Sequence, residues 1–135
     1  MAEFVIGNTN FGVDPNKSSF KLLTKPHGRV VLDVEINGDQ SAYDAASTAE
    51  DSEWFWTLYP PRFYVYSELE RATEGHTLTV QFSAAENESA EMAIYMMNHN
   101  RVADVTLTIY GNRLTASGLV DLMGQSAEFR IDWSR

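Results

Sequence analysis

The fold is decided by residues 104–133, which read DVTLTIYGNRLTASGLVDLMGQSAEFRIDW. Apolar and polar residues alternate through three segments of this stretch, and short glycine-containing pairs separate the segments. Alternation with a period of two is typical of a strand that buries one face, and Gly111-Asn112 and Gly124-Gln125 are typical two-residue hairpin turns. The stretch therefore predicts three consecutive antiparallel strands.

The two expected turns also predict which residues face each other across the hairpins. The first turn sets Leu107 opposite Ala116, and the second sets Val120 opposite Phe129. Both hairpins then place their apolar residues on one face, whereas a slip of one residue would turn a whole strand's apolar set to solvent. In this arrangement Gly118 is a small residue of the central strand that leaves room for larger neighbours.

Residues 90–97 fit either a helix or a strand. The run Ala-Glu-Met-Ala favours a helix. A hairpin turning at His99-Asn100 would instead set Met92 opposite Leu107 and keep the apolar residues on the common face. We favour the strand, which predicts a four-strand meander from Ala90 to Trp133.

Further strands are predicted upstream, over residues 29–36 and 77–82, where apolar residues again alternate. A loop at Pro26-His27-Gly28 would set Leu22 opposite Leu32 and Phe20 opposite Val34. We expect one domain over residues 1–135 with an all-β fold. Its expected form is an antiparallel β-sandwich or flattened barrel of about nine to ten strands that ends in the meander.

Composition narrows the classes of function. The chain has 135 residues, no cysteine and a formal net charge of −9. Absence of cysteine excludes disulfides and thiolate catalysis, and the negative charge argues against nucleic acid and anionic membrane as partners. We see neither a signal peptide nor an apolar stretch long enough to span a bilayer, so we expect a cytoplasmic protein.

The negative charge is concentrated in the middle of the chain. Between Asp33 and Glu91 there are thirteen acidic residues and only two arginines. We interpret Asp39–Glu53 as a long, mobile surface loop with one helical turn near Asp44–Ala49. It leads into residues 53–66, EWFWTLYPPRFYVY, which hold seven of the chain's aromatic residues and which Pro60-Pro61 divides into two strands.

This aromatic stretch is either a strand enclosed in the core or a strand with one face open to a partner. Trp and Tyr are residues that anchor interfaces, and neighbouring carboxylates would speed the encounter with a basic protein. The predicted partner-binding residues are Asp44, Glu50, Asp51, Glu53, Trp54, Trp56, Tyr59, Tyr64 and Tyr66.

No catalytic or metal-binding motif stands out. The three histidines, His27, His76 and His99, lack the spacing of a metal site, and no GxSxG nucleophile turn is present. Residues 7–12 resemble a glycine-rich phosphate loop but lack its Lys-Ser/Thr pair. We therefore expect no enzymatic activity, no metal and no cofactor.

The leading hypothesis is a non-enzymatic protein-binding domain. Its most concrete form is a bacterial immunity protein that binds and occludes a basic toxin. The alternative is a carbohydrate- or small-ligand-binding β domain in which Trp54, Trp56 and Tyr59 form an aromatic platform. A lipocalin-like barrel with a small enzymatic activity is a third hypothesis, for which no residue gives positive evidence.

Overall fold

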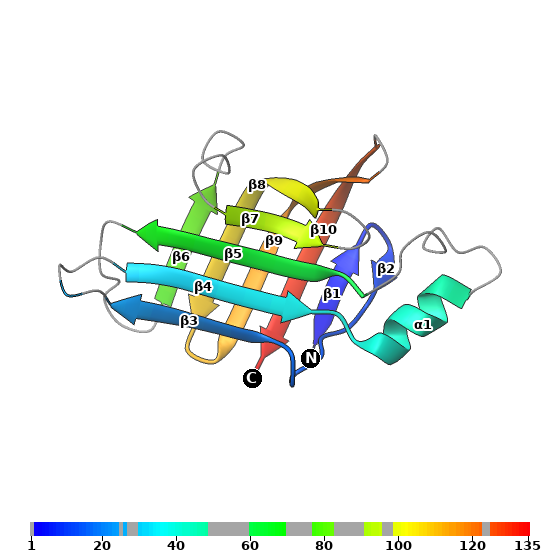
Figure 1. Cartoon of the computed structure of the whole chain (residues 1–135), viewed down its shortest axis with the longest axis horizontal. Helices are drawn as coiled ribbons and strands as arrows, with labels where there is room; N and C mark the ends of the chain where they lie inside the picture. The colour runs from blue at the N-terminus through cyan, green and yellow to red at the C-terminus, as the bar shows by residue number, and fades with distance from the viewer. Residues whose placement is uncertain are drawn as a thin grey trace.

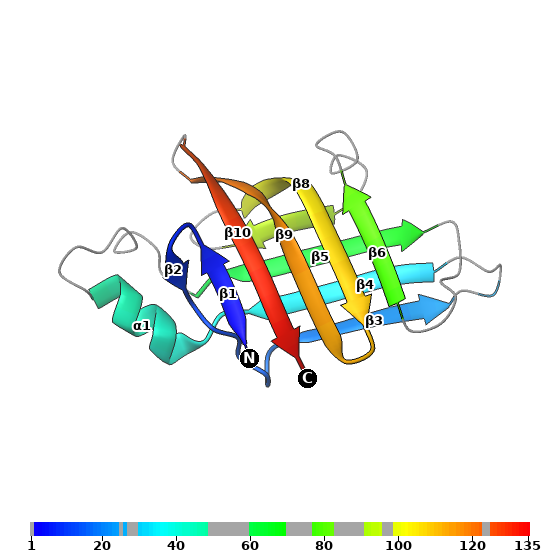
Figure 2. The same ribbon diagram turned by 180° about the vertical axis from the view of Figure 1, so that it is seen from behind.

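The structure is a computed structural model that describes residues 2–24, 26, 30–48, 60–69, 77–82, 91–95, 99–122 and 125–135. These residues form two antiparallel β-sheets and one short helix, which confirms the expected all-β class. Figure 1 shows one sheet in front of the other, with the strands of the two sheets crossing obliquely, and Figure 2 shows the second sheet in front.

Strand order defines the two sheets. Sheet A contains, in spatial order, β2 (Thr9–Asn10), β1 (Glu3–Ile6), β10 (Gln125–Ser134), β9 (Arg113–Leu122), β8 (His99–Tyr110) and β6 (Thr77–Phe82). Sheet B contains β3 (Ser19–Thr24), β4 (Val30–Asn37), β5 (Arg62–Leu69), β7 (Glu91–Tyr95) and the first residues of β8.

Strand β8 belongs to both sheets because a β-bulge interrupts it. Ala103 pairs with Leu119 and Thr106 with Ser117, so two residues of β8, Asp104 and Val105, lie opposite one residue of β9. Asp104 has a φ of 52°, the left-handed conformation found at the first position of one bulge type, and aspartate is among the residues that tolerate it. The bulge lies between residues 99–101 of β8, which pair with β7, and residues 105–110, which pair with β6, while β9 pairs with β8 on both sides of it.

Two predicted pairings are confirmed. Leu107 lies opposite Ala116, with Gly111 at φ 58° in the connecting turn. In sheet B, Phe20 lies opposite Val34 and Leu22 opposite Leu32, as expected for the β3–β4 hairpin.

The predicted register of the β9–β10 hairpin is wrong by two residues. Gln125 pairs with Leu122, and Phe129 lies opposite Gly118 instead of Val120. A slip of two residues leaves every side chain on its predicted face, so alternation does not distinguish the two registers. Packing does, because a Cβ atom at position 118 would lie 2.7 Å from Cε1 of Phe129, and only glycine leaves that space to the ring.

The expected strand over residues 90–97 is present as β7, but its predicted pairing is wrong. Tyr95 pairs with His99, and Met92 pairs with Val65 of β5 instead of Leu107. The position opposite Leu107 on that side of β8 is Val80 of β6. The order β7–β8–β9–β10 of the predicted meander is kept, but the bulge distributes it over two sheets.

The core lies between the two sheets and contains side chains from both. The ring centroid of Phe63 on β5 lies 5.3 Å from that of Phe129 on β10. At another corner, Phe20 of β3 meets Trp133 of β10 edge to face at 5.8 Å, a favourable arrangement of aromatic rings. Large aromatic side chains therefore join the sheets at more than one place.

A helix, α1 (Gln40–Thr48), occupies most of the region predicted as a loop with a single helical turn. Asp39 caps it: Oδ2 accepts hydrogen bonds from the Ser41 hydroxyl and, at 3.1 Å, from the Ala42 backbone N–H. These two hydrogen bonds lower the pKa of Asp39. The other residues of the helix are small or polar, but Tyr43 is buried with its ring 6.5 Å from that of Phe11. Tyr43 therefore joins the helix to the core, and Ala46 packs against the core beside it.

Candidate functional site

The outer face of sheet B carries the two predicted tyrosines that the structure describes. Because Phe63 and Val65 of β5 are buried in the core, alternation places Tyr64 and Tyr66 on the opposite, outer side. Across the sheet, Tyr66 lies opposite Asp33. We call this surface the tyrosine face; it consists of Lys21, Leu23, Asp33, Glu35, Arg62, Tyr64, Tyr66 and Glu68.

Two large hydrophobic side chains of the tyrosine face are exposed. Leu23 of β3 is 45% exposed and Tyr66 of β5 is 41% exposed. Val31 of β4 lies directly opposite Leu23 and alternates with core residues, yet it is only 2% exposed. The face therefore combines one covered valine with an exposed aliphatic and an exposed aromatic side chain.

Two charged pairs lie on the same face. The Lys21 ammonium lies 3.9 Å from the Asp33 carboxylate, and the Arg62 guanidinium forms an ion pair with Glu35. The Arg62 guanidinium carbon also lies 5.4 Å from the centre of the Tyr64 ring, within the range of a cation–π contact. These pairs give the face both charge signs and hold Tyr64 beside Arg62.

The structure does not bring all the predicted site residues together. Asp44 lies on α1, beyond the end of sheet B in Figure 1, where its carboxylate accepts a hydrogen bond from the Gln40 amide at 2.9 Å. It is therefore not part of the tyrosine face. The remaining predicted residues lie outside the described part of the chain, and with them the aromatic platform of the carbohydrate hypothesis: Glu50, Asp51, Glu53, Trp54, Trp56 and Tyr59.

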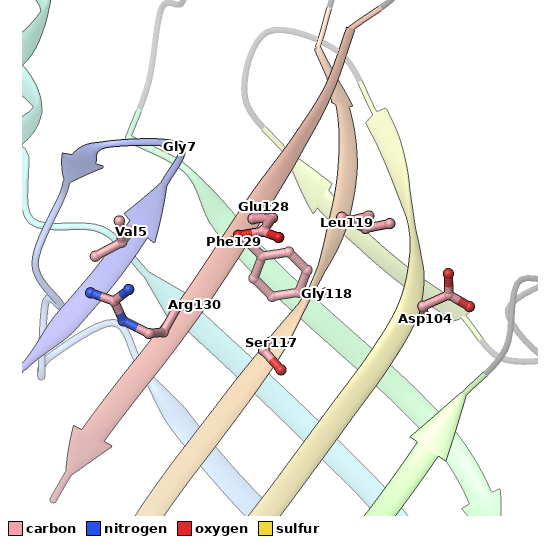
Figure 3. Close-up of a pocket in the computed structure, with 9 residues that line it drawn as sticks. All are labelled: Val5, Gly7, Asp104, Ser117, Gly118, Leu119, Glu128, Phe129 and Arg130. Atoms are coloured by element: carbon pink, nitrogen blue, oxygen red, sulfur yellow. The ribbon is translucent and has the colours of Figure 1, made fainter.

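A second feature, a hollow of about 370 Å³ on sheet A, was not predicted from the sequence. Figure 3 shows it across four neighbouring strands, β1, β10, β9 and β8. The residues that line it are Val5, Gly7, Asp104, Ser117, Gly118, Leu119, Glu128, Phe129 and Arg130. The sequence did contain an indication of the bulge beside this hollow. Val102 and Val105 both face the core although they are three residues apart, and in a regular strand residues at an odd spacing face opposite sides.

Ion pairs also cross this face of sheet A. Arg130 Nε lies 3.4 Å from a Glu3 carboxylate oxygen. Arg113 donates to both oxygens of Asp132, from Nε at 2.9 Å and from Nη2 at 2.7 Å. The hydrogen bond from Arg113 holds the pKa of Asp132 below its ordinary value.

The described part of the chain contains neither a metal-binding cluster nor a membrane-spanning helix. No group of three or more His, Asp or Glu residues there is placed to hold a metal ion. No helix among these residues has the length and apolar character needed to cross a membrane.

Comparison with protein-family models, with curated proteins and with solved structures finds no match to this chain.

Proposed function

We propose that this β-sandwich is a non-enzymatic protein-binding domain that captures a basic protein through the tyrosine face. The observation that carries the proposal is the exposure of Leu23 and Tyr66 on one sheet face, around the covered Val31. Clustered exposed apolar residues mark interaction surfaces, and tyrosine is enriched among the residues that dominate binding energy.

The charge of the chain supports a basic partner. A net charge of −9 attracts a cationic protein over several ångströms and raises the rate of encounter. The Lys21–Asp33 and Arg62–Glu35 pairs lie on the same face, where partner side chains can exchange with them. Burial of Tyr66 and Leu23 would then supply the affinity.

The test is affinity capture from lysate of the source cells with the tagged chain, followed by mass spectrometry at about 50 mM and about 500 mM salt. We expect one basic protein, captured less at high salt. Tyr66→Ala should weaken its affinity by about tenfold or more, because truncation of an interface anchor has effects of that size.

Tyr110→Ala is the matched control, because Tyr110 is 66% exposed but lies at the end of β8 in sheet A. It should leave capture unchanged. Equal capture by wild type and Tyr66→Ala would show that the tyrosine face is not the interface. Capture that does not depend on salt would contradict the electrostatic part of the proposal.

The most concrete form of the proposal is an immunity protein that occludes the active site of a toxin. Co-expression of the captured partner with the wild-type chain should then restore growth to cells that the partner alone inhibits, and Tyr66→Ala should restore it less. A partner that does not impair growth would rule out this form while leaving protein binding in place.

A further inference from the structure

The hollow on sheet A faces away from the tyrosine face, because the two surfaces are the outer sides of the two opposed sheets (Figures 1 and 2). A ligand in the hollow would therefore not occupy the tyrosine face. Its volume of about 370 Å³ is in the range of small-molecule sites.

The β-bulge brings a carboxylate to this hollow. Ala103 faces outward in sheet A, so in a regular strand the next residue, Asp104, would point into the core. The extra residue in the bulge leaves Asp104 exposed while Val105 takes the buried position. Among the described residues, Asp104 is the only one other than glycine with a positive φ.

A second carboxylate stands on the other side of the hollow. Glu128 of β10 lies opposite Leu119 of β9, and Leu119 lies opposite Ala103, the neighbour of Asp104. Figure 3 shows Leu119 between Glu128 and Asp104. Since neighbouring strands are about 4.8 Å apart, the backbones that carry the two carboxylates are roughly 10 Å apart, with an aliphatic side chain between them.

The two carboxylates that line the hollow are not neutralised by any neighbouring cation that the structure describes. Arg130, the one cation among the lining residues, is paired with Glu3. Asp104 and Glu128 have no ion-pair partner among the side chains that the structure describes. The hollow therefore presents two negative groups at its sides and apolar surface from Leu119 and Val5 within it.

We propose that the hollow binds a linear aliphatic diamine or polyamine. One ammonium group lies at Asp104, the second lies at Glu128, and the methylene chain covers Leu119. Ammonium groups are attracted to carboxylates, and methylene groups gain free energy when they cover apolar surface. A monoamine satisfies only one of the two carboxylates and binds more weakly.

The experiment is an NMR titration of the ¹⁵N-labelled chain with cadaverine, spermidine and, as the single-charge probe, n-butylamine. We expect the diamine and the polyamine to shift the backbone amides of the strands around the hollow, those of residues 104, 117–119 and 128–130 above all. Their dissociation constants should be lower than that of n-butylamine.

Three variants locate the binding. Asp104→Asn keeps a residue that tolerates the left-handed conformation, and Glu128→Gln keeps the size of the side chain; each should weaken cadaverine binding by about two- to fivefold. Asp121→Asn is the matched control, since Asp121 is exposed on β9 but is not among the lining residues. It should have a clearly smaller effect.

Two results would overturn the proposal. The first is that n-butylamine binds as tightly as cadaverine, which would mean that the paired carboxylates are not used together. The second is that Asp121→Asn weakens cadaverine binding as much as Asp104→Asn, which would mean that cadaverine responds only to the net charge of the chain.

Discussion

The two hairpins that share β9 are built differently. The β9–β10 ladder pairs ten consecutive residues, from Gln125 with Leu122 to Ser134 with Arg113, without an irregularity. The β8–β9 ladder is interrupted at Asp104. The regular ladder places Phe129, Ile131 and Trp133 in the core. The interrupted ladder lets β8 change sheets and leaves the Asp104 carboxylate exposed. Gly118 lies between the two, opposite Phe129 on one side and the bulge on the other.

Among the substitutions considered, Phe129→Ala in the regular hairpin should reduce the free energy of unfolding most. Phe129 is 2% exposed and contacts the Phe63 ring of the other sheet, so Phe129→Ala leaves a cavity between the sheets. We expect the free energy of unfolding to fall by about 3–5 kcal/mol, measured by urea denaturation. Tyr110→Ala, at an exposed position, should change it by less than about 0.5 kcal/mol. A loss for Phe129→Ala no larger than that of the control would contradict the packing described above.

Gly118→Ala tests the contact between the two hairpins and should rank second. The added methyl group would lie 2.7 Å from the Phe129 ring and 3.1 Å from the Ala103 carbonyl oxygen. Overpacking of this kind destabilises by about 1–3 kcal/mol. In the Phe129→Ala background the ring is gone, so the same substitution should cost clearly less. An equal cost in both backgrounds would show that the ring does not select glycine at this position.

A pair of valine substitutions compares the bulge with the regular strand directly. Asp104→Val puts a β-branched residue at a φ of 52° and should destabilise by about 1–2 kcal/mol. Asp121→Val puts the same residue at an exposed strand position, where β-branched residues are well tolerated. Thermal unfolding of the two variants should therefore separate them. Equal midpoints would mean that Asp104 is not held in the left-handed conformation in solution.

The smallest expected effect on stability comes from the exposed ion pair between Arg113 and Asp132, which joins β9 and β10. Because Arg113 lowers the pKa of Asp132, the folded chain binds that proton less readily than the unfolded chain. The stabilisation is present at neutral pH and is lost as the pH falls through the lowered pKa. The difference in free energy of unfolding between wild type and Asp132→Asn should therefore shrink from about pH 7 to about pH 3.

Arg113→Gln provides the internal check on that pH dependence. It removes the hydrogen bonds that lower the pKa of Asp132 and should give the same trend with pH. The double variant should show no further change beyond either single variant. A difference from wild type that stays constant with pH would mean that the pair does not form in solution.

The sequence predicted which side chains of a strand face the core better than it predicted which residues pair across neighbouring strands. Alternation placed Leu107, Ala116 and Phe129 on the buried side, and all three are buried. It could not decide between registers two residues apart, because both satisfy the same alternation. The decision rests on the fit of the Phe129 ring over Gly118, which is a contact between strands and has no local signal.

For the candidate sites, too, the sequence indicated some residues correctly but not which residues lie together. Tyr66 was predicted as an interface residue because it lies in an aromatic run that follows an acidic segment, and the structure places it exposed on a sheet face. Asp44 was grouped with it because of proximity in sequence, but α1 carries it to another part of the molecule. The hollow was missed because Glu128 and Asp104 come from different strands that only the bulged pairing brings to one surface.

The pairing of β1 with β10 sets a time order for folding during synthesis. Strands β3, β4 and β5 are neighbours in sheet B, and the hairpin between β3 and β4 closes a short loop. Phe4 and Ile6, by contrast, pair with Ile131 and Phe129. These pairs are more than 120 residues apart in sequence, so they can form only after β10 has been synthesised. Both side chains are fully buried in the finished protein. Until β10 is synthesised, these two side chains lack the strand that helps to bury them, so sheet A is completed after sheet B.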